Sequence, residues 1–164
     1  PHFLEDHTVE AKHGIFIQAG RVLLSKIKTE KMIQQKNIDI GFWDKGLENR
    51  KNYLRSVLLS SLFSNISTSL NSIRTCNFSL WREDALAVNG FNEDFVGWGR
   101  EDSEFAARLF HKKLKRKTVR FKATGYHLYH PFQKRLSLRT NDSLLEKTIS
   151  EQLTWCENGL NNHL

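Results

Sequence analysis

Residues 90–102 read Gly90-Phe91-Asn92-Glu93-Asp94-Phe95-Val96-Gly97-Trp98-Gly99-Arg100-Glu101-Asp102 and are the most informative stretch of the chain. Glycine permits backbone angles and close approaches that other residues do not. An aromatic ring between two glycines offers a flat apolar surface, and a neighbouring carboxylate can act as a general base. The combination indicates a site that handles a sugar, at the point where an amphipathic segment begins.

This stretch resembles the acceptor-side motif of GT-A-fold glycosyltransferases. The motif occurs in glycosyltransferase family 2 and, in a Gly-Trp-Gly-Gly-Glu-Asp form, in β-1,4-galactosyltransferases. The resemblance extends upstream through Arg74-Thr75-Cys76-Asn77-Phe78-Ser79 and downstream to Gly125-Tyr126-His127-Leu128-Tyr129-His130-Pro131. It implies an α/β fold in which residues 1–164 form one domain, the acceptor-side C-terminal half of a GT-A enzyme.

The resemblance also implies roles for individual residues. Asp102 corresponds to the catalytic base of inverting enzymes, and Glu101 is expected to bind substrate hydroxyls. Both acids could instead cap the helix that begins there, and capping does not exclude catalysis. The residues expected to bind substrate are Trp98, Gly97, Gly99, Arg100 and Asn77.

Each substrate-binding prediction has an alternative. Trp98 is expected to form an acceptor platform, although a core position is equally compatible with its type. Arg100 stands where galactosyltransferases carry a second glycine, and it could bind donor phosphate or an acidic acceptor. Asn77 is expected to line the donor-sugar pocket, because its amide both donates and accepts hydrogen bonds; it could also be a turn residue at a strand edge.

Two histidines follow in Gly125-Tyr126-His127-Leu128-Tyr129-His130. In GT-A enzymes a histidine near the end of this strand joins an Asp-x-Asp motif in binding Mn²⁺ or Mg²⁺. Residues three apart in a strand point to opposite faces, so only one of His127 and His130 is expected to be a ligand. We expect His130, because Pro131 ends the strand. Both could instead be structural.

The chain contains no Asp-x-Asp, and its first residue is Pro1. We therefore expect the nucleotide-binding half and the remaining metal ligands to precede Pro1 in a longer protein, and the isolated chain to be inactive. The expected reaction is inverting transfer from a nucleotide sugar to a glycan or lipid-linked acceptor, in bacterial surface polysaccharide synthesis.

The charge is concentrated. The net charge is +7, and His111–Lys122 holds seven of the 25 Lys and Arg residues and no acid, which leaves 18 basic and 18 acidic residues elsewhere. Such a stretch can attract an anionic membrane, or it can be a solvated helix end followed by a strand. It also supports an alternative function, a non-catalytic module that binds nucleic acid or another polyanion, although we do not expect nucleic acid as a partner.

The remaining features are typical of a globular enzyme. No apolar run reaches the ~20 residues of a membrane span, and the two cysteines have no Cys-x-x-Cys spacing. We therefore expect a cytoplasmic protein, located at the inner face of the membrane if the basic stretch binds it. The hydrophobic patterns predict helices at 2–13, 47–63, 101–114 and 143–155, and strands at 15–24, 75–80, 118–123 and 126–129.

Overall fold

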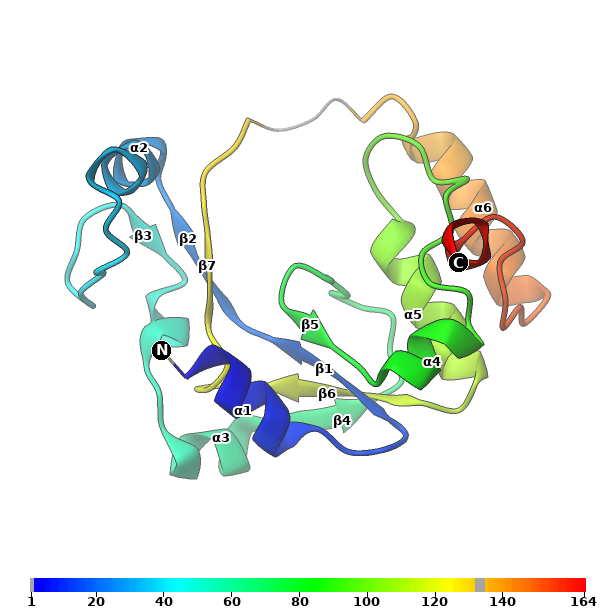
Figure 1. Cartoon of the computed structure of the whole chain (residues 1–164), viewed down its shortest axis with the longest axis horizontal. Helices are drawn as coiled ribbons and strands as arrows, with labels where there is room; N and C mark the ends of the chain where they lie inside the picture. The colour runs from blue at the N-terminus through cyan, green and yellow to red at the C-terminus, as the bar shows by residue number, and fades with distance from the viewer. Residues whose placement is uncertain (1, 132–134) are drawn as a thin grey trace. The chain divides into compact units, whose positions relative to one another are not determined.

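The computed structural model describes residues 2–131 and 135–164 (Figure 1). The chain divides into two compact units, and each is described by itself. Unit 1 comprises the described residues of Pro1–Glu10, Ala19–Asn65 and Thr118–Phe132. Unit 2 comprises those of Ala11–Gln18, Ile66–Lys117 and Gln133–Leu164. Helices and small sheets occur in both units, so the predicted mixed α/β class is confirmed.

Unit 1 is built on a three-stranded sheet in the order β3-β2-β7. β2 (Arg21–Leu24) pairs antiparallel with β3 (Leu47–Glu48) and parallel with β7 (Gly125–His127). The other elements of the unit are the helices α1 (Phe3–Glu10), α2 (Lys26–Gln35) and α3 (Val57–Phe63) and the 3-10 helix η1 (Arg50–Tyr53). Its core contains the buried side chains Val22, Leu24, Met32, Ile40 and Leu47.

One ion pair fastens α1 within unit 1. The Arg55 guanidinium donates to both carboxylate oxygens of Asp6, with distances of 2.7 to 3.2 Å, and the Ala123 amide donates to Asp6 Oδ2 at 2.9 Å. Burial opposes ionisation of this carboxylate, but the hydrogen bonds and the positive charge of Arg55 outweigh burial and hold the pKa of Asp6 below its ordinary value.

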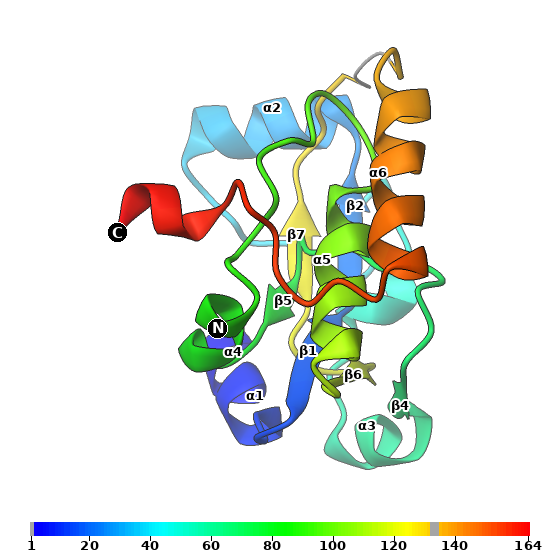
Figure 2. The ribbon, with the colours of Figure 1, turned by 90° about the vertical axis from the view of Figure 1, so that its right-hand side faces the viewer.

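Unit 2 contains a four-stranded sheet in the order β4-β6-β1-β5. Its strands are β1 (Ile15–Ala19), β4 (Asn65–Ser67), β5 (Phe78–Ser79) and β6 (Lys115–Val119), and its helices are α4 (Arg82–Ala87), α5 (Glu101–His111), α6 (Leu138–Ser150) and the 3-10 helix η2 (Leu160–His163). Two views show α6 lying beside α5 (Figures 1 and 2). The core includes Phe16, Val88, Phe105 and Leu109.

A buried ion pair within α5 is hydrogen-bonded to α6. Glu104 and Arg108, one helical turn apart in α5, have exposures of 1% and 0% and make two hydrogen bonds of 2.7 Å. Thr148 of α6 donates to Glu104 Oε1 at 3.1 Å, and Arg108 also donates to the Val88 carbonyl. Every charge in this cluster is thus compensated by a partner inside the fold.

Several predicted elements have different bounds. The strand predicted at 15–24 divides at Gly20 into β1 and β2, which belong to different sheets. The single helix predicted at 47–63 is wrong: Asn49 is left-handed (φ 54°) and Leu54 is extended. These two residues separate β3, η1 and α3.

The strand predicted at 118–123 is displaced toward the N-terminus. β6 ends at Val119, because Phe121 (φ 58°) and Ala123 (φ 51°) adopt left-handed backbone. The helix predicted at 101–114 ends at His111, before the left-handed Lys113. The helix predicted at 143–155 begins earlier, at Leu138, and ends at Ser150. The strands predicted at 75–80 and 126–129 shorten to β5 and β7, and the helix at 2–13 shortens to α1.

Candidate active site

The site begins with an unusual backbone run before α5. Gly97, Gly99 and Arg100 have φ angles of 81°, 105° and 78°. A Cβ added at Gly97 would stand 2.8 Å from Ser137 Oγ, so glycine is required there both by the backbone angle and by the neighbouring side chain. The run brings the chain into α5 with its two acids, Glu101 and Asp102, in the first turn of the helix.

Asp102 is partly buried at the second position of α5. Its Oδ1 atom accepts a hydrogen bond from the Thr75 hydroxyl, which comes from the segment before β5. The positive end of the helix dipole also favours a negative charge at this position. Asp102 is therefore an oriented carboxylate whose second oxygen, Oδ2, is the candidate proton acceptor.

Glu101 has an oxygen in an unusual environment. Its Oε2 atom is buried, and no hydrogen-bond partner reaches it from residues 2–131 or 135–164. Buried carboxylate oxygens are almost always hydrogen-bonded. This oxygen can therefore accept a hydrogen bond from a bound molecule.

Trp98 is 39% exposed. The Arg135 guanidinium carbon lies 4.5 Å from the centroid of the indole ring, a distance typical of a cation–π contact. Arg135 therefore covers part of the ring, and the remaining exposed part is the portion that could contact an acceptor.

The other two predicted substrate-binding residues have protein partners or are buried. Arg100 Nε donates to Asp142 Oδ1 of α6 at 2.5 Å, so its guanidinium is engaged in an exposed ion pair. Asn77 is only 3% exposed and lies immediately before β5. In α6, Asn141 donates to the carbonyls of Val96 and Gly99 at 3.3 and 2.8 Å, which ties the loop to that helix.

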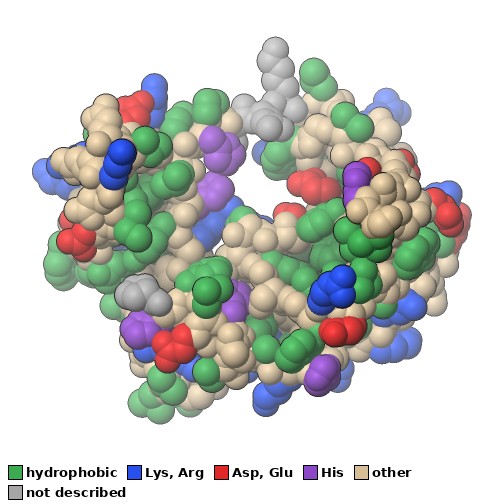
Figure 3. All heavy atoms as spheres, viewed as in Figure 1, with side chains coloured by type: hydrophobic (Ala, Val, Ile, Leu, Met, Phe, Trp, Pro, Cys, Tyr) green, Lys and Arg blue, Asp and Glu red, His purple; other side chains and the backbone are tan. Residues whose placement is uncertain are grey.

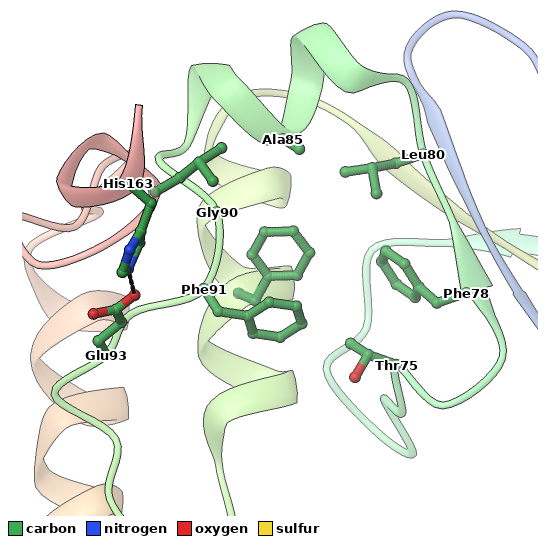
Figure 4. A pocket seen from close by; sticks show the side chains of 10 residues that line it. Thr75, Phe78, Leu80, Ala85, Gly90, Phe91, Glu93 and His163 are labelled. Carbon is green, nitrogen blue, oxygen red and sulfur yellow. Dashed lines mark hydrogen bonds and ion pairs between the residues drawn. The ribbon is translucent and has the colours of Figure 1, made fainter.

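A pocket of about 520 Å³ lies in unit 2 near this loop. Phe91, labelled in Figure 4, and Phe105 both line it, and their rings are stacked with centroids 4.4 Å apart. The Glu93 carboxylate and His163 Nε2 form a hydrogen bond of 2.5 Å at another part of the wall. The complete lining is Thr75, Phe78, Leu80, Ala85, Gly90, Phe91, Glu93, Phe105, Leu160 and His163.

Thr75 connects this pocket to the candidate base, because it lines the pocket and also donates to Asp102. The sequence had placed Thr75 in the matching segment without a role. Nothing in the sequence pattern indicated that His163, 70 residues after Glu93, would reach the same pocket.

The two histidines lie in unit 1, and the acids and the tryptophan lie in unit 2. The expectation that His127 and His130 point to opposite strand faces does not apply, because β7 ends at His127. Their ring centroids are 5.1 Å apart. Burial, then the charges of Arg21 and His130, lower the pKa of His127 below its ordinary value.

The hydrogen bonds define the tautomers of the two rings. Arginine can only donate, so His127 Nδ1 accepts from Arg21 at 3.3 Å, and its neutral ring carries the proton on Nε2. A carbonyl can only accept, so His130 Nδ1 donates to the Pro131 carbonyl at 3.1 Å. The Nε2 lone pair of His130 is therefore available to a metal, whereas that of His127 is not.

The described residues contain no group of three or more His, Cys, Asp or Glu side chains that could hold a metal ion. His130 fits a single position in a mixed nitrogen and oxygen ligand set for Mn²⁺. Histidines that bind metals usually donate their other ring N–H to a carbonyl or a carboxylate, as His130 donates to the Pro131 carbonyl.

The basic stretch is not a uniform surface patch. Arg116 is 6% exposed and donates to the Asn71 carbonyl and to Ser67 Oγ. Lys122 is 8% exposed and pairs with Glu10 at 2.8 Å. Two of the seven cations are therefore used inside the fold.

Comparison with known proteins identifies one relationship. Residues 55–131 match the family model described as the N-terminal domain of galactosyltransferase. The matched segment contains the loop, both candidate acids and both histidines, and it supports a glycosyltransferase-like domain. No curated protein and no solved structure matches the chain. Within residues 2–131 and 135–164, no helix has the length and apolar character required to span a bilayer.

Proposed function

We propose that this chain is the acceptor-side, C-terminal half of an inverting GT-A glycosyltransferase related to family 2. It would transfer a sugar from a nucleotide sugar to a glycan or lipid-linked acceptor in bacterial surface polysaccharide synthesis, at the cytoplasmic side of a membrane. The observation that carries the proposal is the pair of acids at the start of α5, one oriented by Thr75 and one with an unpartnered buried oxygen.

Asp102 acts as the general base in this proposal. Its carboxylate removes the proton from an acceptor hydroxyl as the hydroxyl oxygen bonds to the anomeric carbon of the donor. The bond from that carbon to the diphosphate oxygen breaks, and its electron pair leaves with the nucleoside diphosphate. Attack opposite the leaving group inverts the configuration of the anomeric carbon.

Glu101 and Trp98 position the acceptor. The unpartnered Glu101 Oε2 accepts a hydrogen bond from a sugar hydroxyl, and the exposed part of Trp98 packs against the apolar face of the ring. The pocket beside Thr75 has an apolar lining. It therefore suits an aryl or acyl portion of the acceptor more than a second sugar.

His130 contributes one ligand for Mn²⁺ or Mg²⁺. Its proton lies on Nδ1, which donates to the Pro131 carbonyl, so the Nε2 lone pair can bind the metal. A bound divalent cation would stabilise the charge that develops on the leaving diphosphate. The 164 residues contain no Asp-x-Asp. We therefore propose that the remaining metal ligands come from sequence outside them. We also propose that the 164-residue chain alone has no transferase activity.

The test measures release of nucleoside diphosphate, with Mn²⁺, a panel of nucleotide sugars and candidate acceptors, using the 164-residue chain and the same chain preceded by its upstream coding sequence. Activity of the longer protein should fall by about 10²- to 10⁴-fold in Asp102→Asn. It should be unchanged in Glu146→Gln, a control acid exposed on α6. Full activity of Asp102→Asn would refute the assignment of the base.

The metal assignment is tested on the same longer protein. His130→Ala should weaken Mn²⁺ binding measured by calorimetry, while His127→Ala should have a smaller effect, because Arg21 occupies its Nδ1. Equal affinity of wild type and His130→Ala would refute the assignment.

A further inference from the structure

The helix α3 buries a serine and exposes most of its apolar residues. Ser60 is 2% exposed, and Ser56 and Ser64 make the contacts at the helix ends. Leu59 is half-buried and Ser61 is exposed. The other four side chains are apolar and point outward, with exposed fractions between 52% and 70%. We refer to these four residues as the α3 face: Val57, Leu58, Leu62 and Phe63.

The helix is held by hydrogen bonds. Ser56 Oγ accepts from the Leu59 amide, and the Ser56 amide donates to the Phe121 carbonyl at 2.9 Å. At the other end, Ser64 Oγ accepts from the Arg120 amide at 3.1 Å. This framework keeps four large apolar side chains of one short helix at the surface, and groups of exposed apolar residues commonly mark an interaction site.

The charges next to the α3 face have one sign. Residues 50–64 and 118–122, the two segments joined by these hydrogen bonds, contain Lys and Arg but no Asp or Glu. Lys51 and Arg120 are exposed. Three acids of α1 approach these segments: Asp6 pairs with Arg55, Glu10 pairs with Lys122, and Glu5, whose charge also acts on Arg55, is hydrogen-bonded to His2.

We propose that the α3 face docks on an anionic membrane surface. Its apolar side chains would enter the boundary between headgroups and acyl chains, and the flanking cations would attract the negatively charged lipids. Exposed apolar residues flanked by the exposed cations Lys51 and Arg120 match such a surface. The proposal does not depend on transferase activity, and it assigns membrane contact to α3 instead of to the whole basic stretch.

Other exposed apolar side chains provide a matched control. Hydrophobic side chains also reach the surface over α2 and β3 (Figure 3). On α2, Ile27 and Ile33 are 79% and 61% exposed, close to the 70% and 67% of Leu58 and Leu62. However, Glu30 lies on the same helix, so the charges there are mixed.

The experiment is co-sedimentation of the 164-residue chain with phosphatidylcholine vesicles with and without phosphatidylglycerol. Wild type should bind the anionic vesicles, and more weakly as salt rises. Leu58→Ser/Leu62→Ser should reduce the partition coefficient at least about tenfold, since two large apolar side chains no longer leave water on binding. Ile27→Ser/Ile33→Ser should bind like wild type. Circular dichroism checks that both variants are folded.

Three results would overturn the proposal. They are no binding of wild type to anionic vesicles, equal losses in the α2 and α3 variants, or self-association of wild type that Leu58→Ser/Leu62→Ser abolishes without vesicle binding. The last result would make the α3 face a contact between protein copies. None of these results bears on the Asp102 assay, so the two proposals fail separately.

Discussion

The substitution Glu104→Gln tests the buried ion pair that fastens α5. Glu104 accepts two 2.7 Å bonds from Arg108 and one of 3.1 Å from Thr148. The substitution leaves the guanidinium, with 0% exposure, without a compensating negative charge, and it replaces one of the two carboxylate acceptors by an NH2 donor. Loss of one partner of a buried pair costs about 3 to 5 kcal/mol. The free energy of unfolding should fall by that amount.

Urea unfolding followed by far-UV circular dichroism gives the measurement. Thr148→Val, which removes only the 3.1 Å bond, should cost about 1 kcal/mol. Glu104→Leu/Arg108→Leu removes both charges and should recover much of the loss. If Glu104→Gln lies within about 1 kcal/mol of wild type, the pair does not hold α5 as argued.

Three further predictions concern the loop and unit 1. Gly97→Ala should cost about 1 to 2 kcal/mol more in urea unfolding than Gly14→Ala. Both residues have φ above 70°, but the new Cβ meets another atom only at position 97; equal losses would contradict the clash. Asp6→Asn should lose about 2 kcal/mol at pH 7. Because the pKa of Asp6 is lowered on folding, the wild-type advantage should disappear as pH falls below 3.8, so a constant difference in acid would contradict the linkage. Arg21→Gln should raise the pKa of His127, measured by NMR titration, but burial should keep the pKa below 6.5; an unchanged pKa would exclude a contribution from Arg21.

The local parts of the candidate site could be predicted from the sequence. The spacing of Phe105, Leu109 and their neighbours predicted a helix beginning at Glu101, and α5 begins there. The glycines before it predicted irregular backbone, which the positive φ angles confirm. Both features depend on residues that are close in sequence.

Contacts between distant segments could not be predicted. Thr75 donates to Asp102, 27 residues away. The periodicity of apolar residues does not predict a contact between residues so far apart in sequence. The division of the predicted first strand also depends on the two sheets that its halves join.

The apolar periodicity of residues 47–63 was misinterpreted for another reason. The pattern predicts a helix that buries its apolar side, yet α3 buries Ser60 and exposes Leu58 and Leu62. Spacing reports that apolar residues share a side of a helix. It does not report whether that side is turned toward the core.

The segment after residue 131 has a consequence for how such an enzyme can diversify. The matched region ends at 131. However, Asn141 donates to the Gly99 carbonyl and Asp142 pairs with Arg100, so both residues of α6 contact the loop before α5. Substitutions on α6 can therefore alter the shape of the loop while its own residues stay the same. Under the proposed function, acceptor preference would then change through this outlying helix, and two proteins with identical loops would not have to accept the same molecule.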